Sequence, residues 1–141
     1  MIQLQGATAN GFPARVTGIP IHRQCRRLQF LHSTHWFVEQ GRQIGAYLVH
    51  YADGSEREIP LLFGEDIGSW WRDPQLPRSG ERTVIAWTGT NVPASRSRHH
   101  DMLALYKATW ENPEPNRQVE CIDFLSALTA CSPFLIAVTA E

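Results

Sequence analysis

The stretch that decides the fold runs from Arg27 to Tyr51 and reads RLQFLHSTHWFVEQGRQIGAYLVHY. Apolar and polar residues alternate in its two halves, Arg27–Phe37 and Gln43–Tyr51. Such alternation is the pattern of a strand with one buried face, because successive side chains of a strand point to opposite sides. We therefore predict two strands joined as a hairpin by the five residues between them, with Trp36 beside Ile44.

The same kind of segment recurs along the whole chain. Short runs rich in β-branched and aromatic residues are bounded by Gly, Pro, Asp or Asn, and no dozen consecutive residues carry a helical repeat. One short helical turn is expected over Gly64–Trp71. The spacing predicts an all-β fold, an antiparallel two-sheet β-sandwich with jelly-roll topology, and residues 1–141 are expected to form a single domain. The predicted strands are Ile2–Gln5, Ala14–Ile21, Arg27–Phe37, Gln43–Tyr51, Glu56–Phe63, Thr83–Trp87, Met102–Trp110, Gln118–Ser126 and Phe134–Ala140.

Length and charge narrow the classes of protein to consider. A chain of 141 residues is long enough to bury a core without disulfides. Lys plus Arg number 13, Asp plus Glu number 14, and no long basic run occurs, which argues against a nucleic-acid partner. No apolar run approaches the ~20 residues of a membrane span, and no signal-peptide pattern is expected at Met1–Gln5. The core is expected to come from Leu28, Phe30, Leu48, Ile59, Leu61, Ile85, Leu105, Ile122, Phe124, Phe134, Ile136 and Val138.

The three cysteines form no CxxC pair, so neither a zinc motif nor a full disulfide set is indicated. We expect small buried thiols at Cys25, Cys121 and Cys131. A disulfide between Cys121 and Cys131 is the alternative for an exported protein.

Two histidines, His32 and His50, become diagonal neighbours on an apolar face if the hairpin forms. Imidazole is a common transition-metal ligand, so the pair is a candidate metal site that needs a third ligand such as His35. The alternative, which we favour, is that each is a core histidine satisfied by a carbonyl or a hydroxyl.

Adjacent carboxylates at Glu65 and Asp66 admit three roles. They can cap a short helical turn, bind calcium, or contribute to acid–base catalysis with a partner from elsewhere in the chain. Capping is favoured, because adjacent side chains do not face each other on a helix. No nucleophile elbow, phosphate-binding loop, dinucleotide fingerprint or metalloprotease motif occurs, so no catalytic residue is assigned.

The five tryptophans lie where predicted strands end and turns begin. Indole faces stack on the C–H faces of sugar rings, and nearby polar side chains bind the hydroxyls. The alternative for Trp87 and Trp110, which continue strands, is that they pack the edge of the sandwich. The candidate ligand-binding residues are Trp70, Trp71, Arg72, Trp87, Asn91, Trp110 and Glu111.

A set of short motifs suggests a family. The motifs are Arg27–His32, Val49–Gly54, Ile59-Pro60, Gly64–Asp66, Trp70-Trp71, Ala86–Gly89, Leu105–Pro113, Ile122–Phe124 and Pro133–Thr139. In these motifs the chain resembles the bacterial C-terminal jelly-roll, carbohydrate-binding-like accessory domains found on anti-sigma regulators of the iron-dicitrate sensor type and on glycan-degrading proteins. The resemblance implies a jelly roll in a secreted or cell-envelope protein and implies no catalytic residues.

Family members carry further sequence ahead of the stretch that corresponds to Ile2–Leu4, so we expect this domain to lack an N-terminal strand. A missing strand exposes a sheet edge, which predicts a homodimer that pairs the two edges.

Three functions follow from these observations. The leading hypothesis is a non-catalytic carbohydrate-binding module that recognises polysaccharide through its tryptophans and needs no cofactor. The first alternative is a metal-dependent enzyme acting on polysaccharide through His32 and His50. The second alternative is a structural or protein-interaction domain.

Overall fold

A computed structural model describes residues 1–71, 82–96 and 102–141 of the chain. Nine strands and one five-residue helix occur in this described part, and each predicted strand coincides with an observed one. The elements are β1 (Ile2–Gln3), β2 (Arg15–Gln24), β3 (Arg27–His35), β4 (Gln43–Tyr51), β5 (Glu56–Leu62), β6 (Thr83–Gly89), α1 (Val92–Arg96), β7 (Leu103–Glu111), β8 (Gln118–Ser126) and β9 (Ser132–Ala140).

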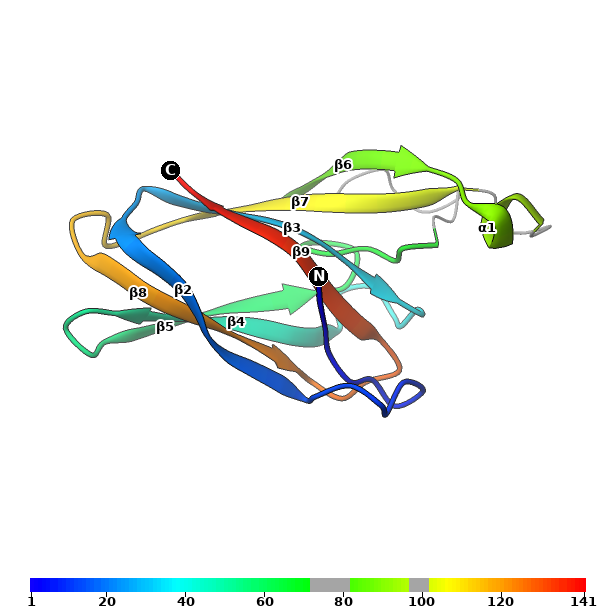
Figure 1. The fold of residues 1–141 in the computed structure, drawn as a ribbon, viewed down its shortest axis with the longest axis horizontal. Helices are drawn as coiled ribbons and strands as arrows, with labels where there is room; N and C mark the ends of the chain where they lie inside the picture. The colour runs from blue at the N-terminus through cyan, green and yellow to red at the C-terminus, as the bar shows by residue number, and fades with distance from the viewer. Residues whose placement is uncertain (72–81, 97–101) are drawn as a thin grey trace.

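The strands form two facing sheets (Figure 1). One sheet has the order β1-β9-β3-β7-β6 and the other has the order β2-β8-β4-β5. All pairings between the named strands are antiparallel. The antiparallel two-sheet β-sandwich predicted from the sequence is confirmed.

The predicted hairpin between β3 and β4 is wrong. β3 belongs to the five-stranded sheet, where it pairs with β7 and β9, and β4 belongs to the four-stranded sheet, where it pairs with β5 and β8. The connection between them crosses from one sheet to the other through left-handed backbone at Trp36 (φ 69°) and Gly41 (φ 80°). A period of two identifies the buried face of a strand but not its neighbour, so the two halves of the deciding stretch face each other across the core instead of lying side by side.

The prediction of which β4 residues face the core is also wrong. A register shift between Gln43 and Gly45 changes which later residues face inward. Tyr47 and Val49 are fully buried, whereas His50 is half-buried on the outer face of the sheet. The histidine that was expected inside the sandwich is therefore available at its surface.

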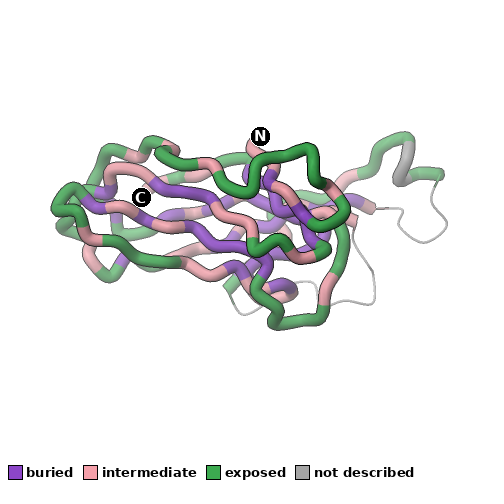
Figure 2. The backbone as a smooth tube through the Cα atoms, turned by 90° about the horizontal axis from the view of Figure 1, so that it is seen from below, coloured by how far each residue is buried: buried purple, intermediate pink, exposed green. Residues whose placement is uncertain are grey.

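Three stacked rings occupy the centre of the core. The ring centroids of Phe30 and Tyr47 lie 4.1 Å apart, and those of Tyr47 and Phe124 lie 4.8 Å apart. These rings come from β3, β4 and β8, so the stack joins the two sheets. Buried residues follow the strands along the inside of the sandwich (Figure 2).

The predicted core is confirmed in part. Ile136 is 39% exposed and was wrongly assigned to the core, because a register shift in the pairing of β9 with β3 breaks the alternation there. Phe134 is buried but lies outside the main core cluster. The remaining predicted residues are buried at Leu28, Phe30, Leu61, Ile122 and Phe124 and half-buried at Leu48, Ile59, Ile85, Leu105 and Val138.

The expected helical turn over Gly64–Trp71 does not form. The chain makes a tight turn closed by a bridge between Phe63 and Ile67 and then runs extended. The carboxylate of Asp66 accepts a hydrogen bond from the Leu62 amide and pairs with Arg82, so it stabilises the turn and does not cap a helix. The one short helix of the described chain, α1, lies in a segment expected to be a loop.

Two further findings bear on the setting of the protein. In the part of the chain that the structure describes, no helix has the length and apolar character needed to cross a membrane. Cys25 and Cys131 are buried free thiols, and Cys121 is a half-buried free thiol. The alternative disulfide between Cys121 and Cys131 is not formed.

Candidate functional site

A short extended segment, Gly68–Trp71, is inserted between β3 and β7. The pairing of these two strands ends at His32. Beyond it, the Trp70 amide donates to the Thr34 carbonyl (2.7 Å), and the Ala104 amide donates to the Trp70 carbonyl (3.0 Å). The inserted segment thus replaces the missing pairing and fixes the backbone of Trp70 within the five-stranded sheet.

Four rings from four different parts of this sheet contact one another. The indoles of Trp87 and Trp70 are stacked, with centroids 6.0 Å apart and an interplanar angle of 16°. Trp70 meets Phe134 edge-on at 5.7 Å, and Phe134 meets His35 at 5.2 Å. We call the four residues Trp87, Trp70, Phe134 and His35 the surface stack.

The surface stack lies on the outer face of the sandwich. Leu135 belongs to the core cluster, so its neighbour Phe134 points to the opposite side of β9. Trp87 is the cross-strand partner of Leu105, and Lys107, two residues further along β7, shares their face. The stack is therefore a surface feature beside a basic side chain and not an extension of the core.

Within the surface stack, exposure increases from Phe134 outward to Trp87. Phe134 is only 3% exposed, Trp70 and His35 are half-buried, and Trp87 is 45% exposed. The ring of Trp87 lies directly against the backbone of Gly89, where any side chain would collide with it. Trp87 is thus supported by Trp70 and Gly89 while much of its surface stays in water.

The polar part of the surface stack is an imidazole. Burial lowers the pKa of His35 below its ordinary value, which keeps the ring neutral at neutral pH. A neutral imidazole both donates and accepts a hydrogen bond. An apolar platform flanked by such a group can hold a flat, weakly polar ligand that also carries hydroxyls.

The structure brings together only part of the predicted ligand-binding set. Trp70 and Trp87 stack, whereas Trp110 packs against the core and Glu111 pairs with Arg27 at the far end of β7. For Trp110, the alternative of an edge-packing role is the better description. Trp110 lies five residues along β7 from Leu105, the cross-strand partner of Trp87, which is roughly 17 Å, and Glu111 lies one residue further.

Of the remaining predicted residues, the structure describes Trp71 and Asn91. Trp71 is half-buried, and its backbone bridges to Leu103. Asn91 is exposed next to α1, and Arg72 lies outside the described residues. Phe134 and His35 are the members that the sequence prediction missed. The signal was present in the apolar pair Phe134-Leu135, since adjacent residues of a strand cannot share a face.

His32 is a satisfied core histidine. Its Nε2–H donates to the Asp66 carbonyl (3.0 Å), and its Nδ1 accepts from the Tyr47 hydroxyl (3.0 Å). Burial lowers its pKa to about 4, against the opposing effect of the Asp66 hydrogen bond. The prediction that His32 and His50 converge is wrong, because they lie in different sheets and His50 points outward.

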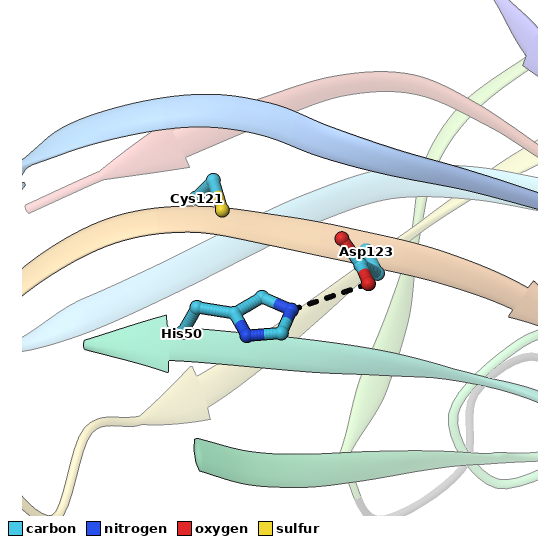
Figure 3. Close-up of side chains that lie close together, drawn as sticks. All are labelled: His50, Cys121 and Asp123. Carbon is cyan, nitrogen blue, oxygen red and sulfur yellow. Dashed lines mark ion pairs between the residues drawn. The ribbon is translucent and has the colours of Figure 1, made fainter. Parts of the chain in front are cut away.

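His50 instead lies in a polar cluster on the outer face of the four-stranded sheet (Figure 3). Its Nδ1 is 3.0 Å from Glu56 Oε1, and its Nε2 is 3.2 Å from Asp123 Oδ2. Cys121 lies directly opposite His50 on β8. We call His50, Cys121 and Asp123 the His50 cluster.

Asp123 is the anchor of this cluster. Its carboxylate accepts hydrogen bonds from the Gly18 amide (2.9 Å) and from Arg15 (3.2 Å). Burial acts to raise the pKa of Asp123, but the Gly18 amide, His50 and Arg15 outweigh it, and the pKa lies below its ordinary value. The carboxylate is therefore ionised at neutral pH.

A cleft of about 150 Å³ opens between the two sheets. Phe30, Ile59 and Trp110 supply apolar walls, and Asp66 and Arg82 form an ion pair at 2.9 Å on its rim. Burial raises the pKa of Asp66, although the Leu62 amide and Arg82 act in the opposite direction. The charges of Asp66 and Arg82 offset each other, and Glu58 adds a further acidic side chain to the lining.

Comparison with known proteins finds no match among protein-family models, curated proteins or solved structures. The resemblance described from the sequence motifs therefore remains a prediction.

Proposed function

We propose that the protein is a non-catalytic carbohydrate-binding module that holds a polysaccharide chain against the surface stack. The observation that carries the proposal is the stacked pair of Trp70 and Trp87 on an outer sheet face, with Trp87 45% exposed. A sugar ring presents an axial C–H face that matches the size and apolar character of an indole.

The arrangement favours binding over stabilisation as the role of Trp87. An indole that contributes mainly to stability is largely buried, because its free energy gain scales with the apolar area removed from water. Trp87 leaves nearly half of its surface in water while Trp70 and Gly89 restrict its movement. A ring that is already fixed loses little conformational entropy when a ligand stacks on it.

Polar groups beside the surface stack suit a hydroxyl-rich ligand. His35 supplies a neutral imidazole, and Lys107 lies on the same face of β7. Together they provide hydrogen-bond donors and acceptors around the apolar surface. Such polar groups fix the orientation of a bound ligand, and the apolar surface supplies the contact area.

The jelly-roll topology and the secreted or cell-envelope setting belong to the same proposal. The first four strands alternate between the two sheets, and strands from both ends of the chain, β1 and β9, pair in one sheet. This order supports a jelly roll, in which two Greek keys interlock.

Affinity electrophoresis through gels that contain plant or microbial polysaccharides tests the proposal. At least one polysaccharide is expected to retard the wild-type protein. The variant Trp87→Ala should lose about tenfold in affinity, since a stacked ring is worth about 1.4 kcal/mol. Val84→Ala is the matched control, because Val84 lies on the same strand and is 50% exposed. Equal retardation of Trp87→Ala and the wild type would contradict the assignment.

We also propose a homodimer formed along one edge of the sandwich. β1, with only two residues, ends the order of the five-stranded sheet. Beside it, residues of β1, β2 and β9 line an apolar groove of about 260 Å³ that includes the exposed Ile136. Sedimentation at micromolar concentration should give twice the 16.0 kDa chain mass, and a strict monomer would contradict the dimer.

A further inference from the structure

One row of residues crosses the outer face of the four-stranded sheet. Cys121 on β8 is the register partner of His50 on β4, and His50 is the register partner of Glu56 on β5. Asp123 lies two residues after Cys121, so it projects from the same face of β8. Backbone pairing alone therefore gathers an imidazole, a thiol and two carboxylates on one surface.

The side chains use this placement to converge. One potential ligand atom from each of His50, Cys121 and Asp123 lies within 4.8 Å of the other two. Figure 3 shows the His50 ring and the Asp123 carboxylate directed toward each other between β4 and β8. The Nε2 to Oδ2 distance of 3.2 Å is close to the roughly 3.3 Å that separates nitrogen and oxygen ligands of a tetrahedral zinc ion.

Glu56 supplies a second and independent indication. Its carboxylate contacts the other ring nitrogen of His50, Nδ1, at 3.0 Å. In metal sites a ligating histidine almost always donates its distal N–H to a carboxylate, carbonyl or water, which fixes the tautomer and raises the basicity of the ligating nitrogen. With Nδ1 occupied by Glu56, Nε2 is the ring nitrogen left to bind an ion, and a bound ion would replace its present 3.2 Å contact with Asp123.

We propose that His50, Cys121 and Asp123 bind a divalent transition-metal ion, with Zn²⁺ as the expected ion. A thiolate and an imidazole select a borderline or soft ion over Mg²⁺ or Ca²⁺, which prefer oxygen ligands. Three protein ligands leave one tetrahedral position open, and His50 and Cys121 are both partly exposed to solvent there.

Binding has a defined proton balance. The Cys121 thiol loses its proton to solvent as the sulfur bonds to the ion, and any proton on His50 Nε2 leaves as well. Burial, together with the charges of Asp123 and Glu120, raises the pKa of Cys121, so the free thiol stays protonated at neutral pH. A coordinated divalent cation reverses this, because it stabilises the thiolate directly.

The main opposing charge is Arg15. Its guanidinium lies 3.2 Å from the same oxygen of Asp123 that contacts His50. The side chain of Arg15 is exposed and can move away, whereas the Gly18 amide holds the other oxygen, Oδ1, in place. We expect Arg15→Gln to raise metal affinity several-fold, since it removes a positive charge beside the ion.

Titration of the full reduced chain with Co²⁺ is the direct test. We expect one thiolate-to-cobalt charge-transfer absorption that saturates at one ion per chain and is displaced by Zn²⁺. Cys121→Ser should abolish this absorption, and Cys25→Ser, a control at a buried thiol, should retain it. Thermal unfolding of each variant verifies that the fold is intact.

A pair of variants on β5 separates the specific contact of Glu56 with His50 from a general effect of negative charge. Glu56→Gln should weaken binding about 10- to 100-fold. Glu58→Gln removes the same charge from the same strand and should leave affinity unchanged.

Three results would overturn the proposal. They are the absence of a thiolate absorption with Co²⁺, its persistence in Cys121→Ser, and equal losses in Glu56→Gln and Glu58→Gln. Binding that survives both Cys121→Ser and His50→Gln would locate the ion elsewhere and would also overturn it.

Discussion

The protein contains two aromatic stacks of similar composition in opposite environments. The core stack consists of Phe30, Tyr47 and Phe124 with His32 beside them, all shielded from water. The surface stack also has three aromatic rings and a histidine, but its outermost ring is 45% exposed. The contrast separates two uses of the same side chains. Rings that meet across the sheets contribute to stability, and under the proposed function the rings on the outer face provide a prepared surface for a ligand.

Truncating one ring in each stack should give the largest difference. Phe124→Ala should lower the free energy of unfolding by about 3–5 kcal/mol, because it opens a cavity where the sheets meet. Trp87→Ala should cost less than about 1 kcal/mol, since much of the ring is already hydrated. Urea unfolding of both variants measures the difference. Similar losses would show that the surface stack is structural.

The two histidines should differ in their effect on acid stability. The pKa of His32 is about 4 in the folded chain and near its ordinary 6.5 in the unfolded chain. The unfolded state therefore binds more protons, and stability falls as the pH drops from about 6.5 to 4. The loss from His32 is about 3 kcal/mol over that range.

Unfolding curves at several pH values test this prediction. His32→Gln should flatten the dependence on pH, whereas His35→Gln, a change in the surface stack, should alter it less. A wild-type slope that is unchanged in His32→Gln would contradict the account of the buried histidine.

The hydroxyl that joins the core stack to His32 should have a smaller effect. Tyr47→Phe keeps the ring stack but leaves His32 Nδ1 without its donor. An unpaired buried acceptor costs about 1–3 kcal/mol. Chemical denaturation at neutral pH measures the cost, and a loss below about 0.5 kcal/mol would mean that another donor replaces the hydroxyl.

A glycine beneath the surface stack should have the smallest effect on stability. Gly89→Ala places a methyl group where the Trp87 ring lies. The methyl group should displace the ring toward solvent, where nearly half of its surface already lies, so stability should change by less than about 1 kcal/mol while the near-ultraviolet circular dichroism of the tryptophans changes. An unchanged spectrum with full polysaccharide binding would show that Gly89 does not position Trp87.

The sequence predicts local structure here much better than it predicts contacts. The strands were located correctly because alternation and turn residues are local signals. Which strands pair is a long-range property, and the connection from β3 to β4 crosses between sheets although its length suits a hairpin. The surface stack was predicted in part, since Trp70 and Trp87 belong to the predicted ligand-binding set and Phe134 and His35 do not.

The missed contacts have identifiable physical causes. The shift of register near Gly45 moved His50 to the outside, and a bulge in one strand is not visible in an alternating pattern. Cys121 and Asp123 reach His50 only through the pairing of β4 with β8, which are about 70 residues apart in the chain. No local pattern contains that information.

A comparison of two similarly exposed tryptophans is the most direct test of the proposal that the surface stack binds polysaccharide. Trp36 is 48% exposed and Trp87 is 45% exposed, but only Trp87 is part of the surface stack. Affinity for a polysaccharide that retards the wild type should fall about tenfold in Trp87→Ala and stay within about twofold in Trp36→Ala. Equal losses, or a loss confined to Trp36→Ala, would contradict the assignment of the surface stack as the binding platform.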